Sequence, residues 1–561
     1  MKKITILLLC LFFGIGLSTA QTRTVTGTVI AEEENEPVIG ASIVVKDNPT
    51  IGTVTDIDGR FTLNVPDGAK TLTISYIGMS TQEATIQPTM TILLKSDMQA
   101  LDEVVVVGYG TQRKKDVTSS ISQIKGDVMA DKASPSFMQQ MAGRAAGVQV
   151  ITGAGDVTAP PKIVIRGVGT ISSDNSPLYV INGVPVTSGN LMYSNSSNNA
   201  LADINPSDIE SMEILKDGAA TAIYGSRAAN GGVLITTKQG KQGSAKISYD
   251  AWFGISQAAK IYDVLNAEEF VMIANEKYAN IEGNPQAFMD EHRTNTDWFD
   301  HTIRTGFQHS HSVSISGATP QTNYHLSVGY TNQQGLAINN QYDRYTFYGR
   351  AEHKFLNNYA SVGMSMNAAV QNNEGPTKGE NSVNDFIIAS SRMLPNVPVY
   401  NPDDPTGYNI DPVDRKSLGS GANARYIENT IANVVWSMKN NKNSNTSYRL
   451  LPTAHLDIKP APWLNYRALI GADVSLLDDK YSWDPASGDG LGYNGLVVKS
   501  WIKRQRWNFQ NILSFNKSFG DHNVDATAVA EWSNYKYNRT TASARNFSDP
   551  FYVDEIITNT Y

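Results

Sequence analysis

The stretch that decides the fold is Leu178–Val186, LYVINGVPV, together with Ile204–Lys238, INPSDIESMEILKDGAATAIYGSRAANGGVLITTK. Asn182-Gly183 lies between two apolar runs, and this dipeptide readily takes the positive φ angles of a type I′ turn. We therefore expect Leu178–Ile181 and Val184–Val186 to pair as antiparallel strands.

The second run predicts a mixed unit of short helices and strands. Asn205-Pro206 is a good helix cap followed by a good first helical residue, and Asp217-Gly218 is a turn signal. Gly231-Gly232 allows the chain to re-enter a strand. The expected elements are a helical turn after Pro206, a strand at Met212–Leu215, a helix at Ala219–Tyr224 closed by Gly225, and a strand at Val233–Thr237.

These residues resemble the plug domain of TonB-dependent outer-membrane receptors, and within that family the SusC/RagA branch. The resemblance implies a plug at residues 116–240, a transmembrane β-barrel around it, and a surface lipoprotein of the SusD type as a partner. It also implies import of a saccharide or peptide, driven by the energy transducer TonB. The residues that carry the motif are Arg166, Asn182, Gly183, Pro185, Asn205, Pro206, Glu213, Lys216, Asp217, Tyr224, Gly225, Arg227, Gly231 and Gly232.

Composition narrows the possible functions. The chain has 561 residues, a formal charge of −8 and no long basic run, which argues against nucleic acid as a partner. Residues 1–20 have the Lys2-Lys3 start, apolar centre and small-residue end of a signal peptide cleaved near Ala20-Gln21. Cys10, the only cysteine, lies in this segment. The mature chain is therefore expected to have neither disulfides nor thiol chemistry.

Residues 21–97 predict a small β-sandwich, because short β runs alternate with turn signals at Asn48-Pro49, Asp58-Gly59 and Asp67-Gly68. The region is similar to the carboxypeptidase-regulatory-like domain often found before SusC-type plugs. Asp56, Asp58 and Gly59 are expected to form a turn; the alternative is a calcium loop, but the glycine spacing of an EF-hand is absent. The runs are Thr24–Ile30, Ala41–Val45, Phe61–Val65, Thr71–Tyr76 and Thr91–Leu94.

Residues 98–115 contain a β-branched run with an acidic start, followed by a basic segment. The acidic start and the position between two domains favour an exposed strip, and the resemblance places a TonB box at this edge of the plug. The alternatives are a last strand of the sandwich or the first strand of the plug. The residues expected to bind TonB are Asp102, Glu103, Val104, Val105, Val106, Val107, Gly108 and Tyr109.

The secondary structure of two further segments of the plug can be predicted from the sequence. Ser134-Pro135 is expected to open a helix with apolar Phe137, Met138 and Met141, which Gly143 and Gly147 end before a strand at Val148–Ile151. Ile163–Gly167 is expected to be the strand that leads towards the hairpin. Arg166 and Arg227 either pair with acidic residues of the barrel wall, as the resemblance implies, or contact the substrate.

Residues 244–561 predict the first part of a transmembrane antiparallel β-barrel, so the chain should be mostly β. Runs of about ten residues alternate apolar and polar side chains, and no mature apolar run reaches the roughly 18 residues of a spanning helix. A soluble sandwich is the alternative, because it also alternates. The runs are Ala245–Gly254, Asn323–Tyr330, Tyr345–Phe355, Ala360–Ala368, Leu464–Val474, Trp507–Phe515 and Val524–Trp532. The aromatic residues expected in interfacial girdles are Tyr330, Tyr345, Phe355, Trp507 and Trp532.

The barrel looks incomplete from its sequence. Roughly nine or ten strands are expected, about half of what the resembling family closes with, so we expect this chain to be the N-terminal part of a longer protein. The long polar segments Ala258–Thr302 and Gln371–Ser447 are expected to be extracellular loops or helices within them.

No arrangement of residues predicts catalysis, a cofactor or a metal. Nucleophile elbows, phosphate loops and zinc motifs are absent, and His309-x-His311 has no third ligand in recognisable spacing. TonB-dependent import across the outer membrane, in contact with its lipid, is the expected function. The alternatives are a surface receptor that signals to an anti-sigma partner and, more distantly, a secreted enzyme with an accessory sandwich.

Overall fold

A computed structural model describes residues 22–32, 36–46, 48–76, 79–94, 104–108, 110–113, 119–126, 128, 134, 136–152, 157–171, 175–192, 198–281, 285–375, 386–424, 431–520 and 522–547. The expected signal peptide, Asp102, Glu103 and Tyr109 lie outside these residues. The chain divides into two compact units, one of residues 1–105 and 111–118 and one of residues 106–110 and 119–561.

The first unit contains a two-sheet sandwich, as predicted. Its sheets have the orders β4-β1-β7 and β3-β2-β5-β6, and alternating side chains such as Val25, Val29 and Ile43 fill the core between them. The strands are β1 Thr22–Ala31, β2 Ser42–Val45, β3 Asn48–Val54, β4 Arg60–Pro66, β5 Thr71–Tyr76, β6 Met79–Thr85 and β7 Thr89–Leu94.

Two details of the sandwich differ from the prediction. Asn48-Pro49 begins β3 rather than forming a turn, and β6 was not predicted, because its mostly exposed residues show no alternation. The Asp56 turn is confirmed: its carboxylate accepts the N–H groups of Asp58 at 3.0 Å and Arg60 at 2.8 Å.

The plug of the second unit is built on a five-stranded mixed sheet with the order β10-β15-β16-β13-β14. Its strands are β10 Ile121–Lys125, β13 Leu178–Ile181, β14 Val184–Val186, β15 Ile209–Leu215 and β16 Gly232–Thr237, and β11 Val148–Ile151 pairs with β12 Lys162–Ile165 in a separate hairpin. The helical elements are α3 Phe137–Gln140, η3 Ala200–Asp203, η4 Pro206–Asp208, α4 Gly218–Thr221 and η5 Ala222–Ala228.

The predicted hairpin is confirmed. β13 and β14 pair antiparallel around Asn182 and Gly183, whose φ angles of 48° and 86° are both positive. Pro185 is tolerated in β14 because this strand lies at the edge of the sheet, where a missing N–H group breaks no ladder. The α3 helix also lies where it was expected, with Phe137, Met138 and Met141 buried in the plug core.

Two expected boundaries in the plug were wrong. The strand β12 ends at Ile165, because Arg166 and Gly167 adopt positive φ angles of 57° and 93°. The helix after Asp217 does not close at Gly225; this glycine kinks the chain at φ 62°, and 3₁₀ turns continue to Ala228.

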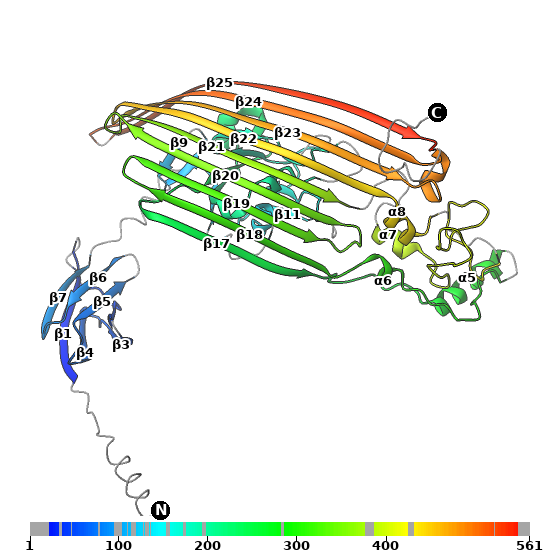
Figure 1. Ribbon diagram of the computed structural model, residues 1–561. Coiled ribbons are helices and arrows are strands. Elements are labelled where there is room, and N and C mark those ends of the chain that lie inside the picture. Colours follow the sequence, from blue (N-terminus) through cyan, green and yellow to red (C-terminus); the bar gives the residue numbers. More distant parts are fainter. Residues whose placement is uncertain are drawn as a thin grey trace, which may run out of the picture. The chain divides into compact units, whose positions relative to one another are not determined.

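The wall is a nine-stranded antiparallel sheet in which sequential strands are neighbours, from β17 to β25 (Figure 1). The strands are β17 Gly243–Ser256, β18 Gly306–Ala318, β19 Thr322–Gln334, β20 Gln341–Phe355, β21 Ala360–Glu374, β22 Lys442–Ala461, β23 Leu464–Trp483, β24 Leu496–Phe519 and β25 His522–Arg545. All seven predicted runs lie in these strands, whereas β18 and β22 were not among them.

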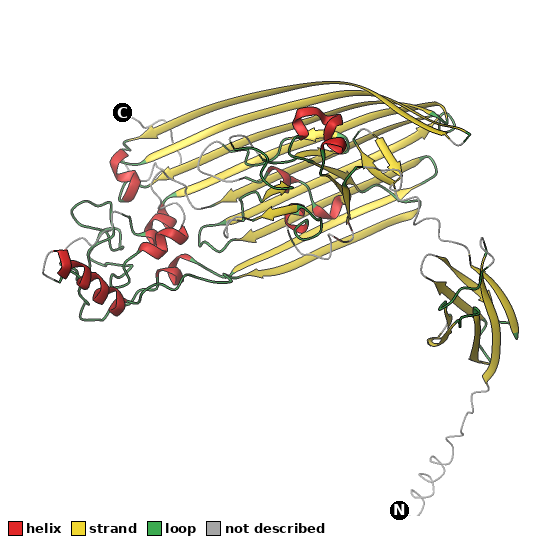
Figure 2. Cartoon of the chain, turned by 180° about the vertical axis from the view of Figure 1, so that it is seen from behind, coloured by secondary structure: helices red, strands yellow, loops and turns green. Residues whose placement is uncertain are grey.

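The two faces of the wall differ as a barrel requires. Outward side chains such as Ile247 and Phe253 are 72% and 65% exposed, whereas inward Ser312 and His325 are buried against the plug. Figure 2 shows the plug elements lying against one face of the sheet. Of the aromatic residues expected in girdles, Tyr330 and Tyr345 have ring centroids 5.0 Å apart with planes tilted by 35°, and Trp532 stacks on Phe509 at 5.9 Å.

Long loops with helices leave one end of the sheet (Figure 1). Their helices are α5 Ala267–Ile281, α6 Trp298–Thr302, α7 Phe386–Arg392, α8 Val434–Asn440 and η6 Gly488–Tyr493. The helices α5 to α8 share a core that includes Trp298, Phe386 and Val435. The predicted loop at Gln371–Ser447 is shorter than expected, because β21 extends to Glu374 and β22 begins at Lys442. Among the described residues, no helix is long and apolar enough to cross a membrane.

Candidate functional site: the contact between plug and wall

The tip of the plug hairpin touches bare backbone of the wall. Gln510 of β24 donates from Nε2 to the Gly183 carbonyl at 3.0 Å. Val184 packs so closely on Gly471 of β23 that a Cβ atom there would lie 2.4 Å from its Cγ2. Val184, which follows the turn, therefore fits a place on the wall that has no side chain.

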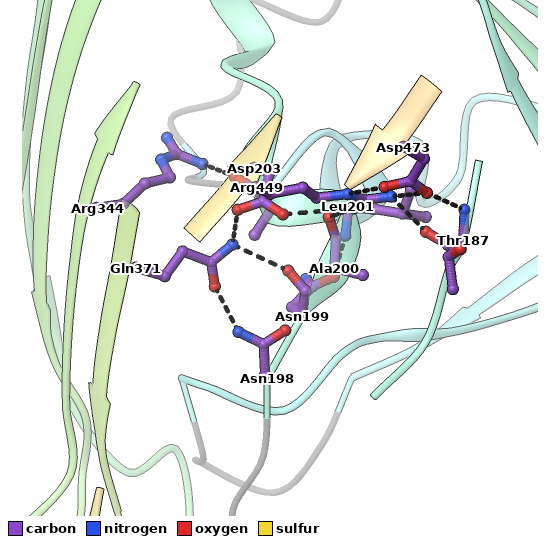
Figure 3. Close-up of polar contacts among 11 residues, drawn as sticks. Thr187, Asn198, Asn199, Ala200, Leu201, Asp203, Arg344, Gln371, Arg449 and Asp473 are labelled. Atoms are coloured by element: carbon purple, nitrogen blue, oxygen red, sulfur yellow. Dashed lines mark hydrogen bonds and ion pairs between the residues drawn. The ribbon is translucent and has the colours of Figure 1, made fainter. Parts of the chain in front are cut away.

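Arg449 of β22 is the centre of a buried polar network between plug and wall (Figure 3). Its Nε and Nη2 atoms donate to the two carboxylate oxygens of Asp473 on β23 at 2.9 and 2.8 Å. On the plug side Nη2 donates to the Thr187 carbonyl at 2.8 Å, and Nη1 donates to the Ala200 carbonyl and, at 3.3 Å, to Asp203 Oδ2. One guanidinium thus joins two wall strands to two segments of the plug.

Neighbouring wall side chains complete this network. Gln371 of β21 donates to Asp203 Oδ1 and, at 3.2 Å, to the Asn199 carbonyl, and it accepts from Asn198 Nδ2 at 3.0 Å. Arg344 of β20 donates to the Ala202 carbonyl of the same plug segment. Residues 198–203 are thereby held by three wall strands, β20, β21 and β22.

The two carboxylates of the network, Asp473 and Asp203, are paired unequally with Arg449. Asp473 takes the bidentate pairing with Arg449 and also accepts the Thr187 N–H at 2.8 Å, whereas Asp203 receives only the longer contact. Burial raises the pKa of Asp203 to about 6, against the opposing effects of Arg449 and Gln371. Asp203 is therefore the carboxyl group of this interface that takes up a proton in mildly acidic solution.

A second group of contacts lies around Asn205 and Thr237. Asn205 caps η4 by accepting the Ser207 N–H at 3.1 Å, and its Nδ2 donates to Ser312 of β18 at 3.0 Å. Asp208 meets His325 of β19 at 3.2 Å, with both side chains buried. Asn182 donates to Thr237 Oγ1 at 2.8 Å, and Thr237 shares a hydrogen bond with Tyr348 of β20.

The two arginines of the plug motif behave differently. Arg227 pairs with Glu531 of β25 at 2.8 Å, which confirms structural pairing with the wall. Arg166 has no such partner among the described residues; its charge lies near the plug residue Asp217 instead. Pairing of Arg166 with a barrel acid therefore stays a prediction.

The remaining motif residues support the plug itself. Asp217 caps α4 by accepting the Ala220 N–H at 2.8 Å and also accepts the Ser120 N–H at 2.8 Å, and these bonds lower its pKa. Glu213 is buried with Gln123 and Ser211 as donors, and burial raises its pKa. Lys216 donates its backbone N–H to Ser120 O, and Pro206 begins η4. Gly231 has φ 90°, and a Cβ there would lie 2.8 Å from Ile165, while Gly232 begins β16.

The strip expected to bind TonB forms strand β8, Val104–Val107, which shares a two-stranded sheet with β9, Gly110–Arg113. Gly108 follows β8 with φ 58°, and its carbonyl accepts a hydrogen bond from Tyr224 Oη at 3.0 Å. A Cβ on Gly108 would lie 2.7 Å from Ile223. The end of the strip is thus fixed to η5, the helix that also carries Arg227.

His309 and His311 lie on β18, on the face that bears Phe307 and Val313 and opposite to buried Ser310 and Ser312. Their ring nitrogens are 3.3 Å apart, and the rings pack against Phe253 and Tyr330. Within the described ranges, no group of three or more His, Cys, Asp or Glu side chains is placed to hold a metal ion.

The wall residues of the interface were not predicted from the sequence. Arg449, Asp473, Arg344 and Gln371 occupy inward positions of strands, where any polar residue fits the alternation. Their only signal is that charged residues at membrane depth are uncommon and usually paired. That signal does not identify the partners.

Comparison with known proteins follows this division of the chain. Residues 113–232 match the TonB-dependent Receptor Plug Domain, and residues 25–106 match the CarboxypepD_reg-like domain. The TonB-dependent receptor SusC of Bacteroides thetaiotaomicron is 37% identical over 405 residues, which are 71% of this chain and 38% of that receptor. A solved structure of the RagAB peptide importer in the open-open state superposes with a TM-score of 0.63 at 23% identity, covering 82% of this chain and 52% of that chain. This chain is similar to the SusC/RagA-type TonB-dependent receptors.

A further relative extends the similarity along the receptor. The TonB-dependent receptor P39 of Formosa agariphila is 30% identical over 555 residues, which are 97% of this chain and 49% of that protein. The chain spans about half the length, or less, of these curated relatives. The relatives are receptors and not enzymes, in agreement with the lack of catalytic spacing in the sequence.

Proposed function

We propose that this receptor takes part in TonB-dependent import of a nutrient, an oligosaccharide or a peptide, across the outer membrane. The plug, residues 116–240, closes the lumen formed by a wall that begins at residue 244. The sandwich, residues 21–97, precedes a TonB-binding segment at 98–115. Residues 1–20 direct export and are removed near Ala20-Gln21.

The single observation that carries this proposal is the buried contact between plug and wall. Arg449, Asp203 and Asp473 are each 3% exposed or less, so water is excluded where the two parts meet. Such a contact prevents passive leakage. Because side chains make it, it can separate without disrupting the sheet of the wall.

The strip Val104–Val107 is the proposed attachment point for TonB. Within the described residues β8 pairs only with β9, so its other edge is available to add a strand from a partner. Backbone hydrogen bonds would supply the attachment, and the side chains need only favour extension.

Proline substitutions test this attachment. Alternate N–H groups of a strand face one partner, so either Val105→Pro or Val106→Pro should remove a bond to TonB, worth roughly 0.5–1.5 kcal/mol, and disturb the strand. At least one of the two should abolish uptake while cells still bind substrate at their surface. Val105→Ile and Val106→Thr are the matched controls and should import normally. Normal import by both proline variants would rule out this strip as the TonB box.

A SusD-like lipoprotein is the proposed partner on the extracellular side. The similar solved structure is that of a two-component peptide importer, RagAB, and loops at this end of the wall form a folded cluster with its own core. Affinity purification of the receptor from native outer membranes in mild detergent should recover the lipoprotein. Recovery of the receptor without it would contradict this part of the proposal.

A further inference from the structure

Two arginines of the wall lie on tyrosines of the neighbouring strand. Arg504 and Arg506 of β24 are directly opposite Tyr537 and Tyr535 of β25. The guanidinium carbons are 5.1 and 5.3 Å from the ring centroids, the geometry of a cation–π contact. The result is a short ladder of two Arg–Tyr pairs.

This ladder faces the lumen. Arg504 donates from Nη2 to the Leu191 carbonyl of the plug at 2.7 Å, and Arg506 has the same orientation because side chains two residues apart share a face. On β25, Glu531 shares the face of Tyr535 and Tyr537 and reaches Arg227 of the plug. The ladder therefore lies beside the plug, on the wall that a solute would pass.

Neither guanidinium has a carboxylate partner in the described part of the chain. Asp473 is opposite Arg506 on β23, but its hydrogen-bond partners are Arg449 and the Thr187 N–H, and no ion pair joins it to Arg506 among the described residues. The Nε atoms of Arg504 and Arg506 are buried without a hydrogen-bond acceptor. Half-buried cations without an anionic partner are costly, and an anion would relieve that cost.

We propose that Arg504 and Arg506 form an anion-binding strip that recognises carboxylate or sulfate groups on the imported solute. A guanidinium whose carbon lies over a tyrosine ring, as in Arg506, can still present two of its N–H groups to two oxygens of a carboxylate or sulfate at once. The stacking also holds the guanidinium in place before the ligand arrives. The inference rests on the proposed import function and adds the charge of its substrate.

Binding to receptor purified from outer membranes tests the strip. The probes are a galacturonate hexasaccharide, its carboxyl-reduced neutral counterpart, a sulfated oligosaccharide and a hexaglutamate peptide. At least one anionic probe should bind more tightly than the neutral one, and added salt should weaken it. Which anionic probe binds identifies the chemical source of the anion.

The variant Arg506→Gln should weaken that binding by roughly tenfold or more, and Arg506→Lys should recover only part of it, because lysine lacks the planar fork. The matched control is Lys503→Gln, which removes the same charge from an exposed, outward position of the same strand. It should bind as the unaltered receptor does. Equal binding by Arg506→Gln, or no binding of any anionic probe, would overturn the proposal.

A separate readout tests import itself. Uptake of the bound probe is measured in cells with and without TonB. If uptake does not need TonB while Arg506→Gln still loses binding, the import function fails and the anion strip remains. If uptake needs TonB but is indifferent to Arg506→Gln, the strip fails and import remains.

Discussion

The substitution Arg449→Met should loosen the plug from the wall. It keeps a flexible, unbranched apolar side chain but removes all five hydrogen bonds that the guanidinium donates to Asp473, Asp203, Thr187 and Ala200. Two buried carboxylates then lack their cation. Breaking a buried ion pair from one side costs about 3–5 kcal/mol, which corresponds to an increase of roughly 10²–10³-fold or more in the population of the detached plug.

Hydrogen exchange should detect this change. Amides of the plug segment 187–203, such as that of Thr187, should exchange faster in Arg449→Met, while amides inside the wall strands should not. Cells with the variant should also become sensitive to vancomycin, a large antibiotic that a sealed lumen excludes.

Two further variants make the prediction specific. Arg467→Met removes another bidentate pair, to Asp457 at 2.7 and 2.9 Å, but this pair lies within the wall, so plug exchange should stay normal. Adding Asp203→Asn and Asp473→Asn to Arg449→Met removes the uncompensated charge and should restore most of the attachment. Unchanged exchange of residues 187–203 in Arg449→Met, or equal acceleration in Arg467→Met, would refute the reasoning.

Three other variants probe separate contacts. The pKa of Asp203 is raised from 3.8 to about 6, so the folded plug binds this proton more tightly than the unfolded chain. The free energy of unfolding should therefore fall by up to about 3 kcal/mol as pH rises from about 4 to 6, and the melting temperature should fall with it. In Asp203→Asn the melting temperature should depend less on pH over this range. Gly108→Ala should weaken the attachment of the Val104–Val107 strip to the plug by about 1–2 kcal/mol, because its φ is 58° and its Cβ would strike Ile223, and limited proteolysis should show faster cleavage there. Arg227→Gln breaks a half-exposed pair with Glu531 and should cost at most about 1 kcal/mol in thermal unfolding.

Local chemistry made the plug predictable. Asn182-Gly183, the Asn205 cap and the Asp217 cap each specify a turn through their own backbone preferences, and all three form as expected. Alternation was enough for strands such as β23, whose inward and outward residues differ in polarity. Both signals act over a few residues, so one sequence is sufficient to read them.

Strands β18 and β22 were not predicted because their alternation of apolar and polar side chains is weak. β18 places His309 and His311 on its outward face, so the difference between its two faces is small. β22 begins with six polar residues and contains Pro452, which removes one ladder donor. Its polar start also made the preceding loop seem longer than it is.

The partners across the interface could not be predicted. The contact of Arg449 with Asp203 joins residues 246 positions apart, and nothing in either segment specifies the other. Arg166 shows the same limit, because nothing in its sequence context indicates that its charge lies near Asp217. Long-range pairing depends on the curvature and register of the whole sheet.

Among the described strands, the sheets of the plug remain separate from the nine-stranded sheet of the wall, and no backbone ladder joins them. The plug is therefore attached to the wall by separate side-chain contacts and not by a continuous row of backbone hydrogen bonds. A mechanical force applied at one end of the plug acts on these contacts individually. Such links rupture one after another, each at modest force, and each can re-form in its original place. A force on the plug would then separate it from the wall stepwise while the wall keeps its shape.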